Sequence, residues 1–166
     1  MISFSASVDG VPEFERAFNR VEGALTDFRF VWPSLAAQFY EIEREQFASQ
    51  GAHGASGSWA PLSPAYAKYK AIAFAGQPIL RATTSLYESL TSSGGHDSVL
   101  RMDAQELTIG TQREGATAHQ RGTPKMPARP PISLTEADKR RLQKAIQLPL
   151  VQFIRRQGLE VVERAA

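Results

Sequence analysis

Residues 98–111 read SVLRMDAQELTIGT, and this stretch decides the fold class. Val99–Met102 and Leu107–Thr111 are rich in apolar and β-branched residues, and the four residues between them, Asp103–Glu106, include no bulky apolar side chain. Two such runs joined by a short connection are typical of a β-hairpin. Because helical patterns lie on both sides of this hairpin, the sequence predicts an α+β fold.

A further strand signal lies in the first ten residues. Ile2, Phe4, Ala6 and Val8 alternate with serines, which is the period-two pattern of a strand with one buried face. Together with the hairpin, this strand would form a three-stranded sheet, which is about the smallest sheet that is stable by itself.

Apolar residues at spacings of three and four predict helices on both sides of the hairpin. The expected helices cover residues 12–28, 33–49, 64–74 and 133–158, with one more short helix around Leu86–Leu90. Ser133–Glu136 reads as a capping box for the last helix, and Pro149 should kink that helix or split it. We therefore expect a single domain over residues 1–166, in which a small antiparallel sheet packs against long helices.

Two segments are predicted to lack regular structure. Residues 51–60 read GAHGASGSWA, and their glycines and serines predict a mobile loop. Residues 112–132 contain two glycines and four prolines and predict an extended arm. A long irregular segment inside a compact domain is usually either functional or disordered.

Charge is unevenly distributed, although the net formal charge is only +2. Residues 1–50 carry four Arg against eight Asp and Glu, which gives −4, whereas residues 115–166 carry ten Lys and Arg against four Asp and Glu, which gives +6. The basic region could bind nucleic-acid phosphates, pair with the acidic region of another copy, or be solvated without a partner. Composition leaves these three alternatives open.

The sequence contains no motif whose residues would form a catalytic site. His53, His96 and His119 lie in three different loops without metal-ligand spacing. Glu41 and Glu45 are one helical turn apart and could form an acid–base pair or bind a cation, but an arginine beside them favours a solvated helix face. The chain has no cysteine, and no stretch approaches the roughly 20 apolar residues that span a bilayer. We expect no enzyme activity, cofactor, metal or membrane contact.

Five short motifs, taken in their order along the chain, are more informative about function than any single residue pattern described above. The five pieces are WAPLSPAY (59–66), ILRAT (79–83), IGT (109–111), AHQ (118–120) and PARPPI (127–132). In this order and spacing they resemble the phage virion morphogenesis family, the tail-completion and neck proteins of tailed bacteriophages, including Mu-like phages. The resemblance covers about residues 40–147. The chain departs from the family pattern at Thr83–Thr84, where Thr-Gly is usual, and at Pro131–Ile132, where an aromatic residue or Leu follows the Ala-Arg-Pro.

The resemblance implies a structural virion protein that completes the neck or tail end without catalysis. It implies a ring of identical subunits, expected to be a hexamer, that bridges the capsid connector and the tail. The implied partners are further copies of the chain, head–tail connector proteins, and tail-tube or tail-terminator proteins, with at most weak, sequence-independent DNA contact in the lumen. The implied location is the neck or tail end of the virion, after assembly in the host bacterial cytoplasm.

Six residues are candidates for contact with these partners: Trp59, Leu62, Tyr66, Arg121, Lys125 and Arg129. The apolar members could anchor an interface, and the basic members could donate hydrogen bonds to carboxylates or phosphates. Two alternatives remain open, because Arg129 could form an ion pair within its own chain, and Trp59 and Leu62 could cover the edge of the core. The rival function is a stand-alone nucleic-acid-binding module that uses the basic C-terminal third.

Overall fold

The computed structural model describes residues 11–157. The elements in chain order are α1 (Val11–Thr26), α2 (Trp32–Ala48), α3 (Pro64–Ala73), α4 (Ser85–Thr91), β1 (Ser98–Met102), β2 (Leu107–Thr111), α5 (Ala116–Arg121) and α6 (Glu136–Arg156). The predicted α+β fold with a small antiparallel sheet is confirmed, and the sheet within the described residues has two strands. The strand predicted over residues 2–8 lies outside the described residues.

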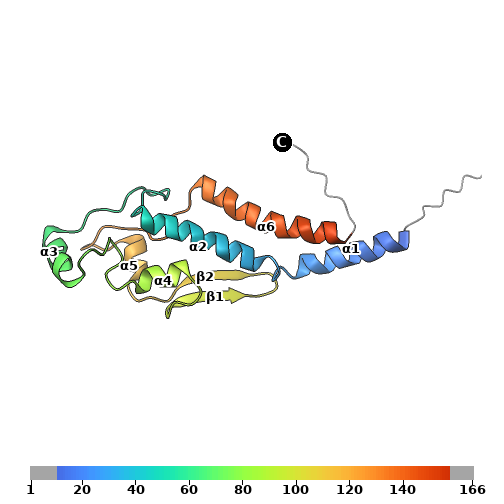
Figure 1. Ribbon diagram of the computed structural model, residues 1–166, viewed down its shortest axis with the longest axis horizontal. Helices are drawn as coiled ribbons and strands as arrows, with labels where there is room; N and C mark the ends of the chain where they lie inside the picture. Colours follow the sequence, from blue (N-terminus) through green and yellow to red (C-terminus); the bar gives the residue numbers. More distant parts are fainter. Residues whose placement is uncertain (1–10, 158–166) are drawn as a thin grey trace, which may run out of the picture.

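The molecule is elongated and built around α2 (Figure 1). α6 runs along one side of α2, while α4 packs on α2 and connects it to the β1–β2 hairpin. α3 and α5 lie at one end of the long axis, whereas α1 extends from the opposite end. No helix within the described residues is long and apolar enough to cross a membrane.

The predicted hairpin is present, and its two antiparallel strands pair with Leu100 opposite Ile109. Its turn is fixed to the beginning of α2 by two hydrogen bonds. The indole Nε1 of Trp32 donates to the carbonyl oxygen of Asp103 at 2.6 Å, and the backbone N–H of Phe28 donates to the carbonyl oxygen of Ala104 at 2.6 Å. These bonds hold the hairpin beside the central helix.

The core lies between α2, α4 and the loop that follows α2. Phe47, Trp59, Leu86 and Leu90 form its buried cluster. The rings of Phe47 and Trp59 meet edge to face with centroids 5.3 Å apart. Burying a side chain such as Phe47 contributes about 1.5–3 kcal/mol, so this cluster is a main source of stability.

The last helix begins two residues later than the predicted capping box. Thr135 is the N-cap residue, and it exchanges side-chain and backbone hydrogen bonds with Asp138. Ser133, the predicted cap, is used elsewhere, because its hydroxyl oxygen accepts from the backbone N–H of Ser56 at 2.9 Å. Of the two outcomes predicted for Pro149, a kink or a split, the split does not occur, since α6 continues through the proline, although proline removes one backbone donor.

The two segments expected to be irregular are both held against the domain. In the 51–60 loop, the backbone N–H of Ala55 donates to the carbonyl oxygen of Ser133 at 3.3 Å. The 112–132 segment is no extended arm, because it contains α5 and folds back on the core. The chain turns sharply after α5 at Gly122, whose φ is 75° and where a Cβ would lie 2.9 Å from the backbone nitrogen of Ala128.

Candidate docking pocket

A cavity of about 580 Å³ opens at the end of the molecule that carries α3 and α5. Its apolar lining residues are Pro61, Leu62, Leu80, Ala82, Leu86, Met126 and Pro127. Four basic residues and one acidic residue also line it, namely Lys70, Arg113, Lys125, Arg129 and Glu114. The net charge of these five is +3. An apolar floor with a few polar groups at its rim is the usual form of a binding site.

Arg129 forms one wall of the pocket and is only 5% exposed. Its Nε donates to the carbonyl oxygen of Ala60 at 2.7 Å, and its Nη2 donates to the carbonyl oxygen of Pro61 at 2.8 Å. Its backbone N–H donates to the carbonyl oxygen of His119 at 2.8 Å. The guanidinium therefore ties the 112–132 segment to the segment before α3 through carbonyl oxygens. Within residues 11–157 it forms no ion pair, which was the open alternative.

α3 forms another wall, and its first turn explains its position. The hydroxyl oxygen of Ser63 accepts from the backbone N–H of Tyr66 at 3.4 Å, and Pro64 occupies the first helical position. On the same helix, Lys70 is buried and its Nζ donates to the carbonyl oxygen of Pro78. Burial lowers the pKa of Lys70 from its usual value. This lysine was not among the sequence-predicted candidates.

His119 also lines this pocket. Burial, with a smaller contribution from the charge of Arg129, lowers the pKa of His119 below its usual value. Its Nδ1 is buried and has no hydrogen-bond partner among the described residues. The imidazole is therefore neutral at pH 7 and does not add to the positive charge of the pocket.

Four of the six predicted contact residues line this pocket: Leu62, Tyr66, Lys125 and Arg129. Trp59 does not, because it is 5% exposed and its indole Nε1 donates to the carbonyl oxygen of Pro130 at 2.9 Å. This finding corrects the expectation of a surface contact at Trp59, which belongs to the core. Arg121 lies exposed at the end of α5, outside the pocket lining.

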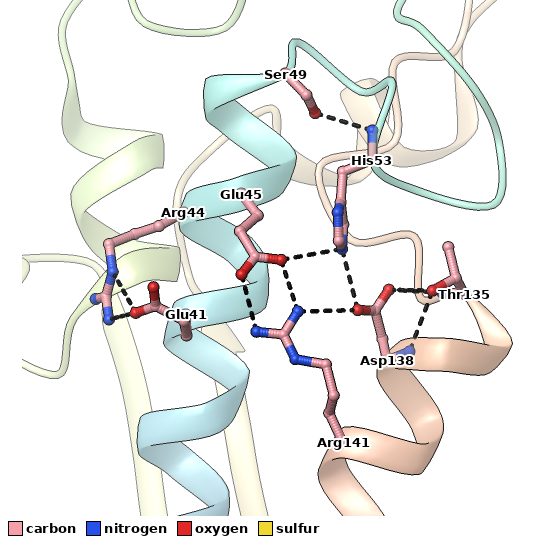
Figure 2. A network of polar contacts seen from close by, with 8 residues as sticks. All are labelled: Glu41, Arg44, Glu45, Ser49, His53, Thr135, Asp138 and Arg141. Carbon is pink, nitrogen blue, oxygen red and sulfur yellow. Dashed lines mark hydrogen bonds and ion pairs between the residues drawn. The ribbon is translucent and has the colours of Figure 1, made fainter.

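A second polar cluster joins α2, the 51–60 loop and α6 (Figure 2). The guanidinium of Arg141 donates from Nη1 and Nη2 to the two carboxylate oxygens of Glu45 at 2.6 and 2.8 Å. The Nε2 of His53 lies 3.0 Å from Oδ1 of Asp138 and 3.5 Å from Oε2 of Glu45. The hydrogen bonds from Arg141 lower the pKa of Glu45. Burial acts to raise the pKa of Asp138, but hydrogen bonds from Thr135 and His53 bring it below its usual value.

The cluster has the donor atoms of a metal site. One ligand atom from each of Glu45, His53 and Asp138 lies within 4.8 Å of the others. However, the Arg141 guanidinium already contacts both carboxylates, at 2.6 Å and 3.5 Å, and supplies their positive counter-charge. We therefore interpret the cluster as a polar link between two helices and a loop.

Glu43 lies on α2 near this cluster and is fully buried, with 0% exposure. Both of its carboxyl oxygens lack a hydrogen-bond partner among the described residues. Burial raises the pKa of Glu43 to about 8, and the negative charge of Asp138 contributes to the shift. The carboxyl group is therefore mostly protonated at pH 7, because an unpaired charge would be costly in this environment.

The backbone also accounts for one departure from the family pattern. Thr84 precedes α4 with a φ of 56°, in the left-handed region that glycine adopts most readily. Here the Thr84 hydroxyl instead donates to the carboxylate of Glu88 at 2.7 Å. The position thus retains the geometry expected of the usual glycine although the residue differs.

Comparison with known proteins supports a family assignment. No curated protein and no solved structure matches the chain. A family model described as the phage virion morphogenesis family matches residues 9–150, a span that includes the entire pocket and the polar cluster. The chain therefore belongs to the phage virion morphogenesis family.

Proposed function

We propose that this protein is a structural component of the phage neck, which completes the tail or joins it to the head. In this proposal, identical copies form a ring, expected to be a hexamer, between the capsid connector and the tail. The observation that carries the proposal is the family match over residues 9–150. The family supports a role in virion assembly, and binding alone, without chemical turnover, is enough for it.

The shape and surface of the molecule support the ring. A closed ring of identical subunits requires that one surface of each copy contacts a different surface of the next copy. The two ends of this elongated molecule differ, because α1 extends from one end and the basic pocket opens at the other. Two unlike ends are what a heterologous contact needs.

Contacts with neighbouring rings and with DNA are part of the same proposal. Head–tail connector proteins would lie on one side of the ring, and tail-tube or tail-terminator proteins on the other. Arg140, Lys144, Arg155 and Arg156 are exposed on α6 and could face DNA in the lumen. Such contacts would be weak and independent of sequence, because they neutralise phosphates without reading bases.

The same exposed residues favour the rival function, a stand-alone nucleic-acid-binding module. Two basic residues of the C-terminal third are used within the domain, however, since Arg129 binds carbonyl oxygens and Arg141 binds Glu45. A third, Lys139, forms an exposed ion pair with Glu136. A nucleic-acid-binding module would bind DNA strongly in isolation, with an affinity that falls steeply as salt rises. A neck protein would show only weak DNA binding and would be found in particles.

The test is the position of the protein in the virion. Phage particles are purified and imaged by electron cryomicroscopy, with the chain carrying a small C-terminal tag that antibody fragments label. We expect label at the junction of head and tail. In parallel, phage lacking the gene should accumulate heads and tails that are not joined, and the intact gene supplied in trans should restore joining. Infectious, fully joined particles that lack the protein would contradict the proposal.

A further inference from the structure

We propose that the basic pocket binds the α1 end of a second copy, so that copies join head to tail. This inference rests on the proposed ring and names the surfaces that close it. The occupant is α1 (Val11–Thr26), and the receiving site is the pocket lined by Leu62, Met126 and Lys125.

The first argument is the arrangement of the two elements along the molecule. α1 extends away from the body at one end of the long axis, and the pocket lies at the other end, beside α3 and α5 (Figure 1). A helix of 16 residues is about 24 Å long, because each residue adds about 1.5 Å. In this arrangement the projecting helix of a chain lies far from its own pocket but can reach the pocket of a neighbour. The contact is then heterologous, which generates a ring when the rotation between copies closes.

The second argument is apolar complementarity. Phe18 on α1 is 54% exposed, and Tyr66 at the pocket is 43% exposed. An aromatic side chain that presents half of its surface to water on a projecting helix is a typical anchor for a partner. The pocket provides the matching surface, since its lining includes Leu62, Leu80 and Leu86, and its volume of about 580 Å³ accommodates several side chains of a docked helix.

The third argument is charge. α1 contains three Glu and two Arg, a net charge of −1. The charged lining of the pocket sums to +3, and Lys125 at its rim is exposed. Opposite charges on two surfaces orient them during encounter and fix which end meets which. The same charges disfavour contact between two pockets or between two α1 segments.

The chain offers a direct test because it has no cysteine. A variant that carries both Phe18→Cys and Met126→Cys is produced in phage-infected cells, and purified particles are treated with a short bismaleimide cross-linker. We expect a ladder of covalent multimers on a denaturing gel, which ends at the number of copies in the ring. The matched control carries Phe18→Cys and Arg101→Cys, because Arg101 is exposed on β1 and does not line the pocket. The control should remain monomeric.

A second measurement uses the two cysteines in separate chains. Purified Phe18→Cys protein is mixed with purified Met126→Cys protein at high concentration and cross-linked. The expected product is a dimer that contains one chain of each kind and nothing larger, since each chain carries only one reactive surface. Variants are compared by circular dichroism first, so that loss of cross-linking is not loss of folding.

The outcomes separate this inference from the proposed function. If the protein is present at the neck but the Phe18–Met126 pair gives no ladder, or the Arg101 control gives an equal one, then the docking inference is wrong and the function stands. If the protein is absent from the neck, the proposed function fails and the docking inference fails with it. A ladder from the Phe18–Met126 pair alone supports both.

Discussion

Replacing Arg129 with lysine should destabilise the domain although the positive charge is kept. The guanidinium of Arg129 is 5% exposed, and two of its nitrogens donate to carbonyl oxygens at 2.7 and 2.8 Å. A lysine ammonium carries its three donors on one nitrogen and cannot reproduce the planar fork, in which two separate nitrogens meet the two oxygens. One hydrogen bond from a charged donor is therefore lost, and one carbonyl oxygen is left buried without its partner.

The magnitude follows from the bond that is lost. A hydrogen bond involving a charged group contributes about 1.5–3 kcal/mol, so we expect Arg129→Lys to lower the free energy of unfolding by about 2 kcal/mol. Arg129→Ala removes both bonds and the packed side chain, and should cost about 3–5 kcal/mol. The matched control is Arg121→Lys, since Arg121 is exposed in the same segment, and it should change stability by less than about 0.5 kcal/mol.

Urea unfolding followed by tryptophan fluorescence measures these differences. Trp59 is a suitable reporter because it lies in the core and its indole binds the carbonyl oxygen of Pro130, the residue after Arg129. If Arg129→Lys loses no more stability than Arg121→Lys does, the bidentate contact with the two carbonyl oxygens does not hold this segment in place. The assigned role of Arg129 as the anchor of the pocket wall would then be wrong.

Three further substitutions test other parts of the structure by the same urea assay. A Cβ at Gly54 would lie 2.7 Å from a carbonyl oxygen, so Gly54→Ala should cost about 1–3 kcal/mol, whereas Gly94→Ala, with no described atom within 4 Å, should be close to neutral. The pKa of Glu43 is raised to about 8 in the folded state, so the folded protein binds a proton that the unfolded chain releases near pH 4.5. The free energy of unfolding of the wild type should therefore fall as pH rises from about 5 to 8. Because glutamine does not titrate, the stability of Glu43→Gln relative to wild type should rise over this window, by at most about 1.4 kcal/mol per pH unit. A flat difference would contradict the buried proton. Thr84→Gly relieves a φ of 56°, a gain of about 1–2 kcal/mol, but loses the hydroxyl hydrogen bond to Glu88, a cost of about 0.5–1 kcal/mol. It should therefore stabilise the domain by at most about 1 kcal/mol, whereas Thr83→Gly, which relieves no positive φ, should not.

The elements that the sequence predicted correctly are those that local patterns determine. The hairpin and the long helices follow from periodicities within one segment, and their bounds in the structure lie within a few residues of the prediction. The predictions that failed depend on contacts between distant segments. The capping box was placed two residues early because Ser133 binds Ser56, 77 residues away. The composition of the 51–60 loop likewise gave no sign of its hydrogen bond to Ser133, which lies just before α6.

The candidate site was predicted in part for the same reason. Leu62, Tyr66 and Arg129 lie in two of the ordered motifs, Lys125 lies two residues before the second of them, and the fold brings those segments together around one pocket. Lys70 was not predicted as a pocket residue, because nothing in the local sequence shows that the side chain of a lysine on a short helix is buried. Similarly, the polar cluster of Figure 2 joins residues that lie 85 and 96 positions apart, and spacing along the chain carries no signal for it.

The structure shows that fewer of the basic residues in the C-terminal third are available for binding a partner than the formal charge suggests. The C-terminal third has a formal charge of +6, but Arg129 and Arg141 are used inside the domain, and Lys139 pairs with its neighbour on α6. What reaches the surface near the pocket is a small number of cations around an apolar floor. Exposed ion pairs contribute little free energy in water, whereas buried apolar surface contributes about 25 cal/mol per Å². The affinity between copies must therefore come mainly from the apolar contact, and the charges decide which end of a copy meets which end of the next.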